Sequence, residues 1–219
     1  MLKKLTLCTI LPFSLYSYEL NFSKKFSQTI NPDILTTRVI ATIENKDEDF
    51  ITNKLEYIND YIKEKEEIKY QDGNFNLTPL YSYNNNKRNF IAYKGNLSYN
   101  IITKDANNMN QFINELIEVK NKLNTNNLKL NISSVNWKVS DNLNSTALDS
   151  LRLNAINWIS LYSKNLHKSC IIKKISIGTN HNYYPRIITN NISRTIPKIT
   201  PTKSVQTISI NPNFTLECR

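Results

Sequence analysis

Apolar side chains recur at helical spacing in three stretches of this chain. A repeat of three or four residues places them on one face of a helix, so each stretch predicts an amphipathic helix. The stripes are Ile51, Leu55, Ile58 and Ile62; then Met109, Phe112, Ile113, Leu116 and Ile117; then Leu148, Leu151, Ala155, Trp158 or Ile159, Tyr162 and Leu166. Carboxylates suit a helix start, and Asp47, Asp105 and Asp141 precede or begin the three stripes.

Between these helices the apolar and polar positions alternate, which is typical of half-buried strands. Residues 34–44 are the clearest case because they are rich in β-branched side chains, and the turn signal Asn31-Pro32-Asp33 precedes them. The expected strands cover residues 19–28, 34–44, 68–83, 90–103, 128–139, 171–177 and 204–216.

The order of these elements predicts an α+β fold with a mostly antiparallel sheet. Strand–strand–helix occurs twice, over residues 18–66 and 67–123. Residues 127–219 form a third block, with a long helix, a C-terminal strand pair and a variable loop over 180–203. We expect each strand–strand–helix unit to be built on its own antiparallel pair.

The first 17 residues have the pattern of a cleavable secretory signal. Lys3 and Lys4 precede the uncharged stretch from Leu5 to Phe13, and Ser17 offers a small residue for cleavage. The stretch is too short to span a bilayer. A buried N-terminal element and an uncleaved anchor are the alternatives. No later segment is long and apolar enough to span, so we expect a mature chain of residues 18–219 without a transmembrane segment.

The charge balance raises the question of a nucleic-acid partner. The formal net charge is +10, and it falls to +8 when Lys3 and Lys4 are removed with the signal. The densest basic cluster, Lys63 to Lys69, is neutralised by its own glutamates, which is typical of a solvated helix face. The other lysine and arginine residues are scattered along the chain. This distribution and the expected export argue against nucleic acid as a partner.

Two cysteines remain once Cys8 leaves with the signal. Cys170 begins one expected strand and Cys218 ends the last one, so the two residues meet if those strands are antiparallel neighbours. In an exported protein this predicts a disulfide. Two free or separately modified thiols are the alternative.

Recognisable catalytic, metal and cofactor patterns are missing from the sequence. His167 and His181 have no partner at metal-ligand spacing, and Cys170 has no CxxC companion. There is no GxSxG elbow, and the three glycines stand alone, without a phosphate-binding loop. We therefore expect a non-enzymatic protein with no cofactor and no metal.

Tyrosines interleave with basic residues, as in proteins that bind single-stranded nucleic acids. Alternation puts Tyr81 and Tyr83 on one face and Tyr93 and Tyr99 on one face, and packing between sheet and helix explains these rings better than base stacking. The residues most open to a ligand or interface role are Tyr81, Tyr83, Tyr93, Tyr183 and Tyr184. A periplasmic small-ligand module, using this tyrosine-rich hairpin and the 180–201 loop, is the alternative function.

Three blocks of sequence resemble the SIMPL domain family of exported bacterial proteins. They are Asn31-Pro32-Asp33-Ile34; Leu80-Tyr81-Ser82-Tyr83 with Phe90-Ile91-Ala92-Tyr93-Lys94-Gly95-Asn96-Leu97; and Val135-Asn136-Trp137-Lys138-Val139-Ser140-Asp141 with Ala147-Leu148 and Ala155. The third helix departs from the family's alanine-rich pattern at Asn154, Asn157 and Ser160, and it ends in Leu166-His167-Lys168 rather than glycine.

This resemblance implies an α+β domain in the periplasm or at the outer membrane. It also implies self-assembly into rings or larger homo-oligomers and no established catalytic residues. The expected function is therefore self-association or binding of other envelope components.

Overall fold

The computed structural model describes residues 17–84, 87–166, 169–178 and 201–219. The chain forms two compact units. Of the described residues, the larger unit contains those within 30–143 and 201–206, and the smaller contains those within 17–29, 144–178 and 207–219. The expected signal (1–17) lies outside the described residues except for Ser17, and so does the expected loop except for its last residues.

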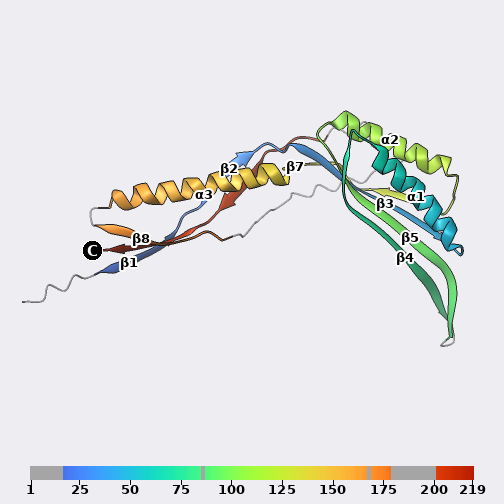
Figure 1. Cartoon of the computed structure of the whole chain (residues 1–219), viewed down its shortest axis with the longest axis horizontal. Helices are drawn as coiled ribbons and strands as arrows, with labels where there is room; N and C mark the ends of the chain where they lie inside the picture. Colours follow the sequence, from blue (N-terminus) through green and yellow to red (C-terminus); the bar gives the residue numbers. More distant parts are fainter. Residues whose placement is uncertain (1–16, 85–86, 167–168, 179–200) are drawn as a thin grey trace, which may run out of the picture. The chain divides into compact units, whose positions relative to one another are not determined.

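The larger unit is an antiparallel sheet with two helices on one face (Figure 1). Strand β3 is central: it pairs with β5 on one side and with the short strands β6 and β7 on the other. Strand β4 pairs with the outer side of β5. The elements are β3 (Ile34–Asn45), α1 (Glu48–Glu64), β4 (Lys69–Asn84), β5 (Lys87–Thr103), α2 (Ala106–Lys122), β6 (Lys129–Ile132) and β7 (Asn136–Lys138).

The core of the larger unit consists of the apolar residues that alternation and helical spacing predict to be buried. Every second residue of β3 from Leu35 to Ile43 is buried on the side that faces the helices. The stripes of α1 and α2 are buried against this face. Asp47 accepts a hydrogen bond from the Phe50 amide at 3.2 Å, and Asp105 accepts one from the Asn107 amide at 2.6 Å. Both caps satisfy amides that the first turn leaves unpaired.

Gly95 of β5 lies where α1 crosses the sheet. A Cβ atom there would come within 2.4 Å of Ile51 Cγ2 and 2.8 Å of Leu55 Cδ1. The absent side chain therefore allows α1 to pack closely on the sheet.

The smaller unit packs the helix α3 on a three-stranded sheet of order β1–β10–β8. From Asn144 onward α3 belongs to this unit, and Leu151, Ala155 and Ile159 pack with Phe214 and Leu216 of β10. Strands β2 and β9 form a separate two-stranded sheet. The elements are β1 (Tyr18–Ser23), β2 (Phe26–Ile30), α3 (Asp141–Lys164), β8 (Cys170–Ser176), β9 (Gln206–Ile210) and β10 (Asn213–Cys218).

The predicted α+β class, the three helices and the mostly antiparallel pairing are confirmed. The pairing of the first strands differs from the expectation. Residues 19–28 form two strands, interrupted at Lys24 and Lys25, and they pair with β10 and β9 rather than with β3. The segments 128–139 and 204–216 are likewise each divided into two strands. In the latter, Pro212 lies in the break between Ile210 and Asn213. It has no amide proton for a ladder, and its carbonyl accepts a hydrogen bond from the Lys24 amide.

Candidate functional site

The predicted disulfide is present between Cys170 and Cys218. Strands β8 and β10 are antiparallel neighbours, and Cys170 and Cys218 are directly opposite in the register. The Cα atoms are 4.0 Å apart, and Cys218 is fully buried on the face that α3 covers. Since disulfides persist mainly in oxidising compartments, the bond indicates an extracytoplasmic location.

The tyrosines of the hairpin and of the expected loop separate into three groups. Tyr99 is buried, and its hydroxyl donates to Asn59 Oδ1 at 2.5 Å, so the interpretation as sheet–helix packing is correct for this ring. Tyr93 packs at the edge of the same core. Tyr81 and Tyr83 lie farther along the hairpin, where Tyr83 is 73% exposed, so packing under a helix does not explain them. Tyr183 and Tyr184 lie outside the described residues.

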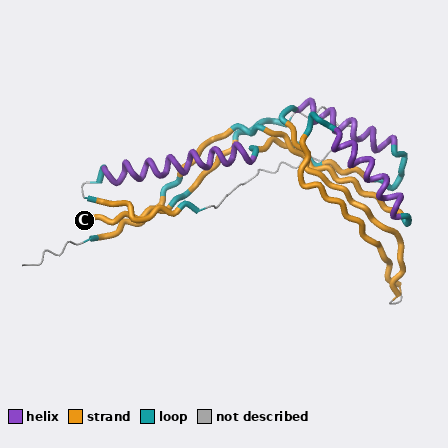
Figure 2. Tube along the Cα trace, in the orientation of Figure 1, coloured by secondary structure: helices purple, strands orange, loops and turns teal. Residues whose placement is uncertain are grey.

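The far part of the β4–β5 hairpin is a two-stranded ribbon, which we define as residues 79–84 and 87–93. Strand β3 ends at Asn45, opposite Tyr93. Beyond that pair β4 and β5 continue with only each other as described partners, and they extend past α1 and α2 (Figure 2).

Aromatic rings form a row along the ribbon. The ring centroids of Tyr81 and Phe90 are 6.0 Å apart, and those of Phe90 and Tyr93 are 4.9 Å apart. The guanidinium of Arg88 lies over Tyr81, 3.5 Å from the ring centroid. These distances are within the range of aromatic and cation–π contacts. The ribbon therefore presents packed rings and a stacked cation on a surface that neither α1 nor α2 covers.

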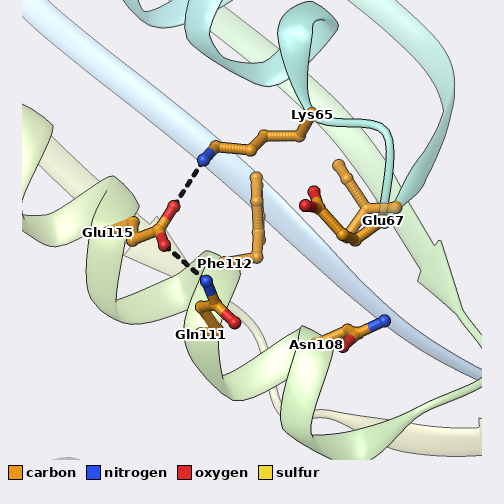
Figure 3. Close-up of a pocket in the computed structure, with 7 residues that line it drawn as sticks. Lys65, Glu67, Asn108, Gln111, Phe112 and Glu115 are labelled. Carbon is orange, nitrogen blue, oxygen red and sulfur yellow. Dashed lines mark hydrogen bonds and ion pairs between the residues drawn. The ribbon is translucent and has the colours of Figure 1, made fainter.

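A small pocket lies between the end of α1 and the start of α2 in the larger unit (Figure 3). Its cavity is about 10 Å³, which is room for a single water molecule. The polar groups around it are those of Lys65, Glu67, Asn108, Gln111 and Glu115.

The carboxylate of Glu115 receives three donors in this pocket. Lys65 Nζ lies 2.5 Å from Oε2, the Tyr61 hydroxyl donates to the same oxygen at 3.0 Å, and Gln111 Nε2 donates to Oε1 at 2.8 Å. The hydrogen bond from Lys65, followed by those from Gln111 and Tyr61, lowers the pKa of Glu115 to about 2. Burial and the bond to Glu115 raise the pKa of Tyr61. Near neutral pH Glu115 is thus ionised and Tyr61 is protonated, and neither exchanges protons readily. The cluster therefore suits a link between the two helices better than proton transfer.

Helix α3 presents an unusual outward face. From Leu153 to Ser163 it carries no charged residue. Opposite the buried stripe, Leu153 is 61% exposed and Leu161 is 62% exposed, with Ile156 also exposed. An ordinary surface helix is polar on that side. The outward face of α3 is therefore uncharged over this stretch and mixes exposed apolar side chains with the amides of Asn154 and Asn157.

Sequence reasoning singled out the tyrosines of the hairpin, but it missed the extension of the ribbon beyond β3 and the Glu115 cluster. Lys65 and Glu115 are 50 residues apart, and no local pattern connects them. One feature of the ribbon was visible in the sequence: from Gly73 to Lys94 the chain contains Lys87, Arg88 and Lys94 and no acidic residue. The exposure of its rings depends on where β3 ends, which alternation in β4 and β5 cannot reveal.

Two of the sequence blocks that resemble the SIMPL family meet in the larger unit. The carboxylate of Asp33 accepts hydrogen bonds from the amide and the hydroxyl of Ser140, both at 2.7 Å. Strand β7 pairs with the start of β3, and the Asp33 amide donates to the Lys138 carbonyl. Ser140 Oγ in turn accepts from the Leu143 amide in the first turn of α3. These motif residues therefore join the segment before β3 to the segment between β7 and α3, which closes the larger unit. This geometry gives them a structural role.

The described part of the chain contains no group of three or more His, Cys, Asp or Glu residues placed to hold a metal ion. His167 and His181 lie outside that part. Among the described helices, none has the length and apolar character needed to cross a membrane.

Comparison with known proteins identifies a family but no role. No curated protein matches the chain. One solved structure that is similar is the de novo designed protein Foldit4, at 12% identity and a TM-score of 0.29, covering 47% of this chain and 98% of that one. The family model described as "SIMPL: Protein of unknown function (DUF541)" matches residues 22–188. That match spans most of the chain and includes the three sequence blocks described above, so the chain belongs to the SIMPL family.

Proposed function

We propose that this protein is a non-enzymatic component of the periplasm that acts by self-association or by binding other envelope components. The observation that carries the proposal is the outward face of α3, which is uncharged over residues 153–163 and exposes Leu153, Ile156 and Leu161. Exposed apolar side chains without intervening charge are typical of protein contact surfaces. A second copy of the same face is the simplest partner, since most homo-oligomers use self-complementary patches.

Location in the periplasm is supported by the N-terminal pattern and by the disulfide. Residues 1–17 combine a basic start, an apolar stretch and a small residue for cleavage. The Cys170–Cys218 bond fits an oxidising compartment.

A non-enzymatic role is supported by what the described pocket can do. Its cavity has room for about one water molecule, and its best-placed carboxylate is already held by three donors. A substrate would have to displace these bonds to reach Glu115.

Light scattering coupled to size-exclusion chromatography tests self-association. We expect the purified protein to run above its monomer mass of 25.5 kDa less the signal. The double variant Leu153→Gln/Leu161→Gln, which keeps helix propensity, should shift it toward monomer. Tyr57→Gln is a matched control because Tyr57 is exposed on the outward side of α1. The proposal is overturned if the protein is monomeric at every concentration and captures no envelope component. It is also overturned if the protein is an oligomer whose mass does not change in the Leu153→Gln/Leu161→Gln variant.

A further inference from the structure

We propose that the ribbon at the end of the β4–β5 hairpin binds the surface of a bilayer that contains anionic phospholipid. This goes beyond the proposed function, because it concerns the larger unit and a different chemistry from the α3 surface. It stands on three observations: the extension of the ribbon, its exposed apolar side chains and its one-signed charge.

The ribbon is accessible along its length. It begins where β3 ends opposite Tyr93, and beyond that point no other described strand of the larger unit pairs with it and neither helix of that unit covers it (Figures 1 and 2). Strand β4, on its outer edge, is exposed at nearly every residue. A surface approaching the tip therefore meets the ribbon before it meets the helices or the remaining sheet of this unit.

The ribbon exposes apolar groups that a water-facing hairpin ordinarily lacks. Tyr83 is 73% exposed, Phe90 is 45% exposed and Ile91 is 46% exposed. Tyr81 and Phe90 are directly opposite across the strands, so their rings share one face, while Leu80 lies on the other face. Apolar side chains on both faces of a protruding ribbon fit insertion at a boundary better than docking of one face on a flat protein surface.

The charge of this segment has one sign. Lys87 and Arg88 lie on β5 close to the tip, whereas Lys94, just beyond the base, is paired with Glu44 of β3 at 3.7 Å and is not counted. No acidic residue occurs between Gly73 and Lys94. Arg88 stacks on Tyr81, which holds a cation directly above a ring. Near an anionic membrane each Lys or Arg contributes about 1 kcal/mol of attraction.

Aromatic rings beside lysine and arginine are the combination that suits the headgroup region of a bilayer. Tyrosine has an apolar ring and a polar tip, and basic side chains place their charges among the phosphates. The ribbon has no hydrogen-bonding pocket for one particular ligand among its described residues. Its features therefore match an extended anionic interface, and the binding should be weak and sensitive to salt.

Flotation with vesicles tests this proposal on the full oxidised protein. We expect binding to phosphatidylcholine vesicles that contain phosphatidylglycerol, little binding to phosphatidylcholine alone, and release at high salt. Lys87→Gln/Arg88→Gln should lower the partition coefficient about thirty-fold, since it removes two cations. Tyr83→Ser/Phe90→Ser should lower it about tenfold.

Two control variants match these changes elsewhere in the same unit. Lys120→Gln/Lys122→Gln removes two cations from the last turn of α2, and Tyr57→Ser removes an exposed ring from α1. Both controls should bind as the parent protein does. The proposal is overturned if phosphatidylglycerol vesicles are not bound at low salt, if the controls lose as much binding as the ribbon variants, or if only the charge variant loses binding, which would mean nonspecific adsorption.

A labelling measurement keeps the test independent of whether the ribbon variants fold. An environment-sensitive fluorophore attached at Asn89→Cys, on the ribbon, should shift to the blue when phosphatidylglycerol vesicles are added. The same fluorophore at Asn53→Cys, exposed on α1, should not shift. A shift at Asn53→Cys alone, or at neither position, would contradict the proposal. Binding to anionic polymers such as heparin without a shift on vesicles would mean that the partner is a different polyanion.

Discussion

The two units of the molecule differ in what surrounds their buried, mostly aliphatic cores. In the larger unit the two helices bury mostly isoleucine, leucine and methionine against β3 and β5. In the smaller unit Trp158 is the centre of a ring cluster, with Tyr162 at 4.8 Å, Phe214 at 5.6 Å and Phe22 at 6.1 Å between centroids. Lys24 lies over the Trp158 ring at 3.9 Å. The smaller unit thus adds a partly exposed cluster of rings to a core whose buried members are mostly aliphatic.

The units also differ in how their chain segments come together. Most of the larger unit is one continuous stretch, residues 30–143. The smaller unit brings together three stretches that are far apart in sequence, and its disulfide joins two of them across a separation of 48 residues. Closing long loops has an entropic cost, and a covalent link lowers it in the unfolded state. We infer that the disulfide occurs in the unit whose segments are farthest apart in sequence.

The largest effect should come from removing the disulfide. For a loop of this length, the chain-entropy model gives a loss of about 4 kcal/mol in the free energy of unfolding. Each unit contains one of the protein's two tryptophans, Trp158 in the smaller and Trp137 in the larger. In a Trp137→Phe background, urea unfolding followed by Trp158 fluorescence should show this loss for Cys170→Ser/Cys218→Ser.

The control for this prediction is the other tryptophan. In a Trp158→Phe background, the transition reported by Trp137 should move little when the cysteines are replaced. Equal shifts at both tryptophans would mean that the two units unfold as one cooperative structure, and the comparison between them would fail.

A second prediction acts only on the larger unit. Gly95→Ala forces a methyl group against Ile51 and Leu55 of α1, and such overpacking should lower stability by about 2 kcal/mol. Trp137 fluorescence in urea would report it. Gly178→Ala is the matched control in the smaller unit, because a Cβ there meets nothing within 4 Å. A Gly95→Ala protein as stable as the parent would show that α1 can shift freely over the sheet.

Much of this architecture was predictable because its causes are local. The stripe Ile51, Leu55, Ile58 and Ile62 defines a helix through spacing alone, and Asp47 and Asp105 mark helix starts through the carboxylate that a first turn needs. The disulfide was predictable as well, since its two cysteines lie at opposite ends of strands that could pair antiparallel. In each case the deciding interaction lies within one element or between two neighbours.

The rest depended on distant partners. Residues 19–28 read as one strand, yet Leu20 pairs with β10 and the segment after Lys25 pairs with β9, about 190 residues away in sequence. Alternation indicates that a face is apolar and does not indicate what covers it. This is why Tyr99 and Tyr83 looked equivalent in sequence, although one is buried under α1 and the other is exposed on the ribbon.

The third prediction concerns the link that closes the larger unit without a covalent bond. Asp33 and Ser140 are 107 residues apart and share two short hydrogen bonds. Asp33→Ala would leave the Ser140 groups without their acceptor, which should lower stability by about 1.5 kcal/mol. Urea unfolding followed at Trp137 measures this, with Asp60→Ala on the exposed side of α1 as the control. If Asp33→Ala lowered the free energy of unfolding as much as loss of the disulfide, the hydrogen-bonded link of the larger unit would matter as much as the covalent link of the smaller one. The comparison between the two units would then fail.

The smallest effect, and the most specific, is the pH dependence of the Glu115 cluster in the larger unit. The pKa of Glu115 is about 2 in the folded protein and about 4.5 when unfolded, so its bonds stabilise the fold above the unfolded value and are lost as pH falls through the folded one. Because the carboxylate is about one-third exposed, solvent screening limits the contribution to about 1 kcal/mol. The free energy of unfolding at Trp137 should therefore decline between pH 4.5 and 2, and Glu115→Gln should flatten that decline. Glu118→Gln, exposed on the same helix, should leave it unchanged, and equal flattening by both variants would assign the effect to the net charge of α2 rather than to the three donors around Glu115.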